Sequence, residues 1–345
     1  IHKKTALLYA SQFGHDECIL LLLSHKDIDV SIKDALGKTA LMSAAFYGHE
    51  RSVAAFLYHN YHNFNLLSSS SIFTKSSKKM LPEQSFIDIN AVDSDGRTAL
   101  LHSASHGHSK CIKLLLTHPF LNISTVDKSG KNALDLACWH GHASCVEVLL
   151  QHPAILPNTR TSRGVTSLML ASKSSSSSCV QAMLKCKYLN INQTDDNGKT
   201  ALMHACDTGC YETVKLFLHH PSINLSIFDE DGRTALLHAA VLPCDTQVKC
   251  VDTIISWHKT FLRKSISSSI LLKTSFNINQ ISPSSKTALI YACQYGSVRS
   301  LDILLSHPQI DIDLPDNHGQ TPLMHVVQYQ PRSHLKTFLD FISAI

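Results

Sequence analysis

The chain has 345 residues, a formal net charge of +4 and eleven cysteines. This charge is too small to indicate a nucleic-acid-binding protein, because such proteins concentrate Lys and Arg on one face and reach a more basic pI. The cysteines are odd in number and scattered, with no signal peptide before them, so we expect an intracellular, cytoplasmic protein. The longest apolar run, around Leu20 to Leu23, is far shorter than the roughly 20 residues of a membrane span.

A short phrase, which reads TALLYA in its first copy, recurs along the chain and predicts a repeat protein. The nine copies start at Thr5, Thr39, Thr98, Asn132, Thr166, Thr200, Thr234, Thr287 and Thr321. Successive starts lie 34 residues apart, except for one interval of 59 and one of 53. We therefore expect residues 1–345 to form a single array of about nine repeats.

Each copy predicts the same succession of elements. A short first helix opened by Thr is followed by a turn, which reads Gly-His in four copies, and by a second helix such as CIKLLL. An extended exit follows, in which Pro119 or Pro221 stops the second helix. A turn such as Asp127 to Gly130 then reverses the chain as a hairpin.

Helix, turn, helix and hairpin in this order resemble the ankyrin repeat, and the resemblance covers nearly the whole chain. It implies an all-α repeat solenoid of stacked helix-turn-helix-hairpin units. The copies depart from the family pattern TPLH, because most read Thr-Ala-Leu and several place a His one position later. These histidines are His102, His204, His238 and His325. The usual Gly-Ala after the second helix is replaced by a longer exit, which does not threaten the fold because a Pro stop also ends a helix.

Two insertions interrupt the period, at about residues 60–84 and 257–275, and both fall mainly after a second helix. The first is Ser-rich with little to bury, so we expect it to be disordered. The second carries Lys259, Arg263, Lys264 and Lys273 without an acidic residue. Basic Ser-rich loops can have a weak regulatory role as phosphorylation sites, partner motifs or membrane-surface contacts. A tolerated loop is the simpler alternative, because closure entropy grows slowly with length.

The fifth copy differs from the others at its turn. It has Ser175 and Ser176 where other copies have Gly and His, and Thr161 replaces the Asp of its hairpin. A left-handed turn residue other than Gly costs about 1 to 2 kcal/mol. We therefore expect the array to loosen first at the fifth copy.

The stretch CWHGHASC, residues 138–145, places two cysteines and two histidines within eight residues and raises the question of a zinc site. Cys138 falls at a small first-helix position that Ala fills in other copies, Cys145 begins a second helix, and His142 belongs to the Gly-His turn. Zinc needs four ligands within about 2.0 to 2.3 Å, and residues two apart on a helix, such as Cys138 and His140, face different directions. We expect core cysteines and no metal.

No set of nucleophile, base and orienting residue emerges, so we expect neither catalysis nor a bound cofactor. A solenoid of this type has a large concave face, and its expected function is that of a non-catalytic scaffold or adaptor that binds one or more proteins there. The resemblance places partner-facing residues at the hairpin tips and at the exposed ends of the first helices. The candidates are Phe13, Lys38, Phe46, Tyr47, Arg97, His106, Lys131, Trp139, His140 and Arg233.

Two other classes of function remain open. The chain can be the ankyrin portion of a larger assembly, such as a phosphatase regulatory subunit or the cytosolic part of a channel. The apolar stripe of Leu335, Phe338, Leu339 and Ile342 in its last helix points to further repeats or to an interface. A metal-binding or nucleic-acid-binding protein is the third class, and stoichiometric zinc or salt-dependent nucleic-acid binding would revive it.

Overall fold

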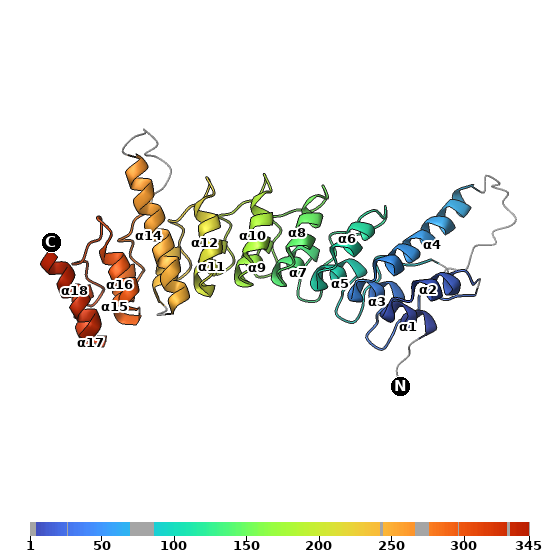
Figure 1. Ribbon diagram of the computed structural model, residues 1–345, viewed down its shortest axis with the longest axis horizontal. Helices are drawn as coiled ribbons and strands as arrows, with labels where there is room; N and C mark the ends of the chain where they lie inside the picture. Colours follow the sequence, from blue (N-terminus) through green and yellow to red (C-terminus); the bar gives the residue numbers. More distant parts are fainter. Residues whose placement is uncertain are drawn as a thin grey trace. The chain divides into compact units, whose positions relative to one another are not determined.

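The computed structural model describes residues 5–25, 27–69, 86–241, 244–265, 276–295, 297–329 and 332–344, which form eighteen α-helices and no strand (Figure 1). The chain divides into two compact units, Ile1–Pro157 (unit 1) and Asn158–Ile345 (unit 2). Unit 1 holds the first four predicted repeats, with helices α1 (Ala6–Phe13), α2 (Asp16–Leu23), α3 (Ala40–Tyr47), α4 (Glu50–Ser69), α5 (Ala99–His106), α6 (Ser109–Leu115), α7 (Ala133–Trp139) and α8 (Ala143–Leu150). Unit 2 holds the other five, with helices α9 (Ser167–Lys173), α10 (Ser177–Leu184), α11 (Ala201–Thr208), α12 (Tyr211–Leu218), α13 (Ala235–Val241), α14 (Asp245–Ser265), α15 (Ala288–Tyr295), α16 (Val298–Leu305), α17 (Pro322–Tyr329) and α18 (Arg332–Ala344).

Within each unit, the first helices of successive repeats stack in one layer and the second helices stack in another (Figure 1). In unit 1, α1, α3, α5 and α7 pack in that order, beside α2, α4, α6 and α8. The odd-numbered and even-numbered helices of unit 2 form the same two layers. The core lies within and between the layers, where Leu100, Ile112 and Leu134 are almost fully buried. The predicted fold class, an all-α repeat solenoid, is confirmed.

The recurring residues of each repeat determine its local structure. The side chain of Thr98 accepts a hydrogen bond from the backbone N–H of Leu101 and so caps the start of α5. Gly107 ends the same helix in the left-handed conformation, with φ of 82°. At the hairpin tip, one carboxylate oxygen of Asp93 accepts two backbone hydrogen bonds of 2.9 Å. The Thr, Gly and Asp of the repeat therefore serve as helix cap, helix stop and turn.

The structure differs from the sequence expectation where the insertions begin. Helices α4 and α14 continue through Ser69 and Ser265, so the first part of each insertion extends a second helix. Neither extension contains the Pro or Gly that would stop it. The extension of α14 also packs on the next repeat, because His258 is buried and stacks on His307 at 5.0 Å. The disorder expected for the remainder of the first insertion concerns residues 70–85, which lie outside the described residues.

The turn of the fifth repeat has the strain that its sequence predicts. Ser175 adopts φ of 55°, in the left-handed region where Gly14, Gly48 and Gly107 lie in other repeats. Thr161 supplies its hairpin tip with one side-chain hydrogen bond, to the backbone N–H of Val165. In this repeat, Ser therefore replaces the Gly of the left-handed turn, and Thr replaces the Asp of the hairpin tip.

Replacing Ser175 by Gly is expected to stabilise unit 2, because the substitution removes the steric penalty of a β-carbon at positive φ. The expected gain in unfolding free energy is about 1 kcal/mol, measured by urea denaturation, with slower amide exchange in α9 and α10. Ser174→Gly is the matched control, because Ser174 has φ of −80° and has no such penalty to lose. An equal change in both variants would show that Ser175 is not strained.

Candidate functional site

The stretch from Cys138 to Cys145 is part of the core and of a turn. Both cysteines are completely buried, Cys138 in α7 and Cys145 in α8, as the repeat register predicts. The ring of His142 is engaged with the backbone of the preceding repeat, with Nε2 3.1 Å from the carbonyl oxygen of Ser105. In the described part of the chain, no three His, Cys, Asp or Glu side chains lie close enough to hold a metal ion.

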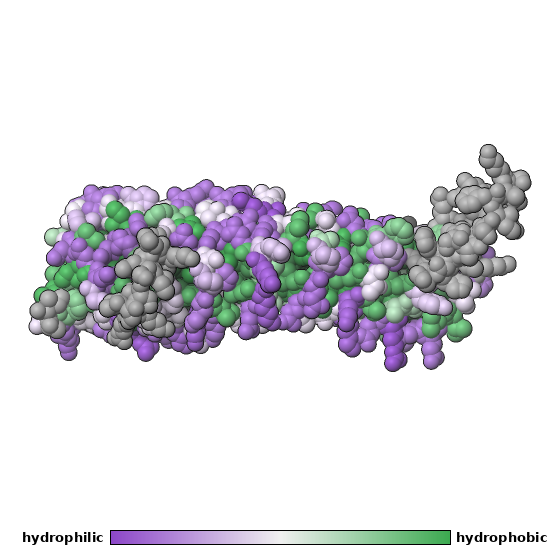
Figure 2. Space-filling model, turned by 90° about the horizontal axis from the view of Figure 1, so that it is seen from above, coloured by the Kyte–Doolittle hydropathy of each residue, from purple (hydrophilic) through white to green (hydrophobic). Residues whose placement is uncertain are grey.

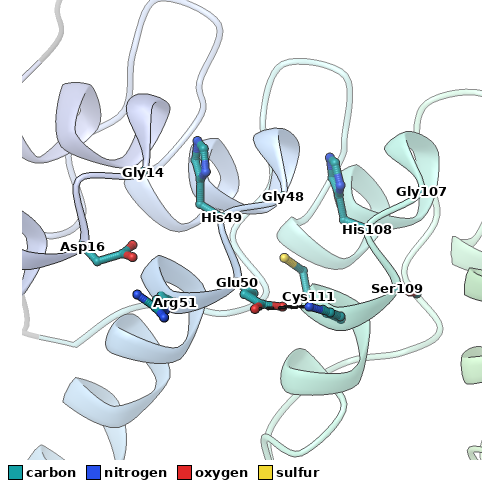
Figure 3. Close-up of a pocket in the computed structure, with 11 residues that line it drawn as sticks. Gly14, Asp16, Gly48, His49, Glu50, Arg51, Gly107, His108, Ser109 and Cys111 are labelled. Atoms are coloured by element: carbon teal, nitrogen blue, oxygen red, sulfur yellow. Dashed lines mark hydrogen bonds and ion pairs between the residues drawn. The ribbon is translucent and has the colours of Figure 1, made fainter.

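The histidines of the Gly-His turns connect successive repeats of unit 1. Nε2 of His49 lies 3.0 Å from the carbonyl oxygen of Gln12, and Nε2 of His108 lies 2.9 Å from that of Phe46. A carbonyl only accepts, so each ring donates from Nε2. Each ring also packs on the glycine of the preceding turn, Gly14 or Gly48. Figure 3 shows the two rings pointing the same way, one repeat apart.

The turns of the first three repeats line a shallow depression of about 500 Å³ (Figure 3). Two of its charged groups pair with each other, since the Nζ of Lys110 lies 3.1 Å from a carboxylate oxygen of Glu50. Burial, together with Glu50, raises the pKa of Cys111 to about 11, so its thiol stays protonated and is not a nucleophile. We therefore interpret this depression as the exposed side of the turns and do not propose it as an active site.

A second recurring contact joins the residue before the Thr cap to a residue near the end of the same first helix. In unit 1 it pairs a cation with an aromatic ring. Nζ of Lys38 lies 3.9 Å from the centre of the Phe46 ring, and Nζ of Lys131 lies 5.6 Å from that of Trp139. Such cation–π contacts orient the ring without neutralising the cation. The structure therefore brings four of the predicted partner-binding residues together in two pairs.

The last residue of the first helix, or the next one, carries a second set of rings in unit 1. Phe13, Tyr47, His106 and His140 occupy this position, and each stacks on the histidine two residues later, at 6.0 to 6.2 Å for Phe13, Tyr47 and His140 and at 6.3 Å for His106. All four side chains are exposed; the exposed fraction is 58% for Phe13 and 48% for Tyr47. Phe46 links neighbouring repeats, since its ring centre lies 4.0 Å from that of His106.

The two predicted arginines lie in different units. Arg97 of unit 1 reaches the next hairpin, where its guanidinium lies 3.4 Å from a buried carboxylate oxygen of Asp127. Arg233 of unit 2 is bound within its own hairpin, at 3.1 Å from Asp229 and also in contact with Asp231. Nine of the ten predicted residues therefore belong to unit 1, and Arg233 stands apart from them.

Sequence reasoning missed a set of buried His–Asp pairs. His102 Nε2 lies 2.7 Å from the carboxylate of Asp93, and the same pair recurs at 2.9 to 3.0 Å with partners nine residues apart. The further pairs are His204 with Asp195, His238 with Asp229 and His325 with Asp316. The signal was present, because each of these four histidines follows a tip aspartate by nine residues.

Burial decides the protonation of two of these histidines. It lowers the pKa of His102 to about 4 against the opposing effect of the Asp93 hydrogen bond. The pKa of His204 is likewise lowered to about 4, first by burial and then by the charge of Lys173. Near neutral pH these two rings are therefore neutral donors to their aspartates, so they support the hairpins and are poor candidates for binding a ligand.

Apolar side chains also reach the surface outside the first helices. The exit loops expose Phe120, Leu156 and Tyr188, with exposed fractions of 63%, 67% and 84%. Figure 2 shows hydrophobic residues interspersed with hydrophilic ones on the face that it presents. None of the helices in the described ranges is long and apolar enough to cross a membrane.

Comparisons with known proteins agree with this architecture. A family profile for ankyrin repeats in three copies matches residues 2–67, 76–161, 168–264 and 259–343. The crystal structure of the ankyrin repeat domain of Bcl-3, "a unique member of the IkappaB protein family", is 19% identical with a TM-score of 0.56, covering 73% of this chain and 98% of that one. The human ASB11 ankyrin repeat domain is also 19% identical with a TM-score of 0.51, covering 68% and 90%.

At these identities the two structures show the fold alone. A search of curated protein sequences gave no significant match. The family profile, in contrast, spans nearly the whole sequence. The chain belongs to the ankyrin repeat family.

Proposed function

We propose that this protein is a non-catalytic scaffold or adaptor that binds partner proteins on its concave face, with the main contacts on unit 1. Ankyrin repeats typically mediate protein–protein interactions and are generally non-catalytic. The observation that carries the proposal is the pair of Lys131 and Trp139, because Trp139 keeps 43% of its surface exposed at the end of a first helix.

The position of Trp139 is not one that the fold reserves for a large ring. The equivalent residues of the next two repeats are Lys173 and Asp207. The neighbouring Cys138, by contrast, is completely buried in the core. Exposed Trp and Tyr side chains are frequent hot spots of protein interfaces, because they bury much area at modest cost in conformational entropy. Trp139 is therefore the side chain that we expect to contribute most to binding.

Replacing Trp139 by Ala is expected to weaken partner binding about 30-fold, which corresponds to the roughly 2 kcal/mol of a true hot spot. The measurement is affinity purification with the full chain as bait, mass spectrometry, and titration of the recovered partner. Tyr188→Ala is the matched control, since Tyr188 is 84% exposed but lies on an exit loop of unit 2. The control is expected to retain the partner.

Thermal unfolding of the same variants separates binding from stability. We expect the melting temperature of Trp139→Ala to stay within a few degrees of the unmodified protein, because the removed ring is half exposed. If Trp139→Ala unfolds, or binds the recovered partner with unchanged affinity, Trp139 packs between repeats and the proposed binding face is wrong.

A further inference from the structure

We propose that the inner strip of unit 1, formed by Lys38, Phe46, Arg97, Lys131 and Trp139, binds an acidic, extended segment of a partner protein. This inference rests on the proposed function and adds the chemistry of the partner to it. The strip has three cations and no carboxylate, beside the exposed ring of Trp139 and the partly buried ring of Phe46.

The residues of the strip come from neighbouring repeats that are tied together at their tips. The backbone N–H of Ser94 donates to the carbonyl oxygen of Leu36 at 2.9 Å, and that of Lys128 donates to Asp95 at the same distance. These two bonds join the hairpins of the second, third and fourth repeats. The first helices behind them, α3, α5 and α7, pack in the same order. The backbone hydrogen bonds and the helix packing therefore fix the residues of the strip relative to one another.

Three of the carboxylates of these tips accept hydrogen bonds from backbone N–H groups of their own hairpins. One oxygen of Asp34 accepts from the backbone N–H groups of Leu36 and Lys38, at 2.9 and 2.8 Å. Asp93 and Asp127 accept equivalent backbone bonds and are buried. Among tip residues 33–38, 93–97 and 127–131, all of which the structure describes, Asp95 is the one exposed carboxylate.

Most cations of these described tips contact a ring or a backbone carbonyl rather than a carboxylate. Lys38 and Lys131 face the rings of Phe46 and Trp139, which leave their charge intact. Lys128 is exposed, and Lys33 donates to a backbone carbonyl at 2.8 Å. Among these described tip cations, Arg97 is the one with a carboxylate partner, at 3.4 Å. The three tips together carry five cations and four carboxylates, and three of those carboxylates are partly or fully buried, so the accessible charge is mainly positive.

The nearby imidazoles respond to this positive charge. The pKa of His140 is lowered, first by burial and then by His142, His106, Arg97 and Lys131. Lys38 and Arg97 likewise oppose protonation of His102, after burial has made the largest contribution. Arg97 and Lys131 thus both act on His140, and Lys38 and Arg97 both act on His102, so the effects of neighbouring cations of the strip add to one another. Such addition favours the electrostatic attraction of an acidic segment.

Unit 2 offers an internal comparison, because two of the equivalent cations there, Lys199 and Arg233, pair with carboxylates of the chain itself. Nζ of Lys199 lies 2.9 Å from the carboxylate of Asp207, which occupies the position of Phe46 and Trp139. Its tips expose three carboxylates, Asp196, Glu230 and Asp231. Lys286 meets the side-chain oxygen of Gln294 at 2.9 Å. Lys286 also lies 6.0 Å from the centre of the Tyr291 ring. What distinguishes unit 2 is that the position of Phe46 and Trp139 carries no ring in any of its repeats, where the residues are Lys173, Asp207, Val241, Gln294 and Gln328.

An extended acidic segment suits this surface for two reasons. Carboxylates form charge-assisted hydrogen bonds with Lys and Arg, and alternate residues of an extended chain can place apolar side chains against Trp139 and Phe46. Lys131 lies beside the exposed ring of Trp139, and Lys38 lies beside the partly buried ring of Phe46, so both kinds of contact can form at once. Phosphates of a single-stranded nucleic acid are the competing occupant, and the experiment distinguishes them.

The test is a selection from a displayed library of random 12-residue peptides with the full chain as bait. Peptides that also bind the double variant Lys38→Gln/Lys131→Gln are removed. We expect the enriched peptides to be net negative and to contain apolar residues. A synthesised enriched peptide is expected to bind the double variant about tenfold more weakly, and the unmodified protein about fivefold more weakly at 200 mM than at 50 mM NaCl.

The matched control is Lys286→Gln, the equivalent substitution in unit 2, which is expected to leave the affinity unchanged. Enriched peptides with the average charge of the library, or an absence of enrichment, would overturn the inference, as would equal binding by the double variant. Tighter binding of a fluorescent dT12 oligonucleotide than of the peptides would also overturn it. In each case a partner captured in a Trp139-dependent manner would still support the proposed function, whereas loss of that dependence would refute the function itself.

Discussion

Lowering the pH from 7 to 5 is expected to reduce the unfolding free energy by several kcal/mol, because three buried histidines resist protonation in the folded protein. Burial lowers the pKa of His102, His204 and His307 to about 4. In the unfolded chain each histidine has a pKa of about 6.5. The unfolded state therefore binds more protons between these values, so stability falls as the pH falls from 6.5 towards 4.

The expected loss is roughly 2 kcal/mol at pH 5 for each of the three histidines, and urea denaturation at pH 7, 6 and 5 measures it. The aspartates respond at lower pH. Despite burial, which raises it, the pKa of Asp207 is lowered to about 2 by His238 and Lys199, so its contribution is present above about pH 4 and is lost below that. The loss between pH 7 and 5 therefore belongs to the histidines.

His102→Gln is the variant that assigns part of this loss to one residue. The amide can donate to Asp93 but does not titrate, so we expect a smaller difference in stability between pH 7 and pH 5, reduced by about 2 kcal/mol. His219→Gln, which changes an exposed histidine, is the control and is expected to keep the full difference. Equal stability at pH 7 and 5 in the unmodified protein would refute the expected proton linkage.

His238 shows why such pairs cannot be treated alike. Its Nε2 lies 2.9 Å from Asp229 and its Nδ1 lies 2.7 Å from Asp207, so both ring nitrogens face carboxylates. The second ring nitrogen of His102, by contrast, has no hydrogen-bond partner. The same sequence position thus has two carboxylate partners in one repeat and a single one in another.

The fold was predictable from the sequence because its determinants are local and repeated. Thr98 caps a helix and Gly107 ends it through contacts within a few residues, so a fixed period of such residues is enough to predict stacked helix pairs. The positive φ of Ser175 was predictable for the same reason, since the register places it where other repeats have Gly.

Contacts between repeats were beyond the same reasoning. The bond from His108 to the carbonyl of Phe46 joins residues 62 positions apart, and no local pattern encodes its geometry. The pairing of Lys131 with Trp139 depends on side-chain direction across a whole helix. The long helices α4 and α14 were missed because a Ser-rich sequence favours disorder, whereas nothing in the preceding segments stops the helix. The repeat register therefore predicted which positions form the candidate site, but it did not predict the contacts that their side chains make.

Replacing Gly48 by Ala is expected to destabilise unit 1 by about 3 kcal/mol, because the added β-carbon meets two obstacles at once. Gly48 has φ of 77°, where an L-residue pays about 1 to 2 kcal/mol. The new carbon would also lie 2.3 Å from Nδ1 of His108, so the ring must move. That movement strains the 2.9 Å bond from His108 to the carbonyl of Phe46, which is worth roughly another 1 kcal/mol.

Gly319→Ala separates the two costs, and a double mutant tests their cause. Gly319 has φ of 74° but no atom within 4 Å of the added carbon, so we expect a loss of about 1 kcal/mol, from backbone strain alone. In the double variant Gly48→Ala/His108→Ala the obstructing ring is absent. We therefore expect the double variant to lose about 1 kcal/mol less unfolding free energy than the sum of the losses of the two single variants, as measured by urea denaturation. Equal losses at Gly48 and Gly319, or additive losses in the double variant, would show that the turn histidines do not hold successive repeats in register.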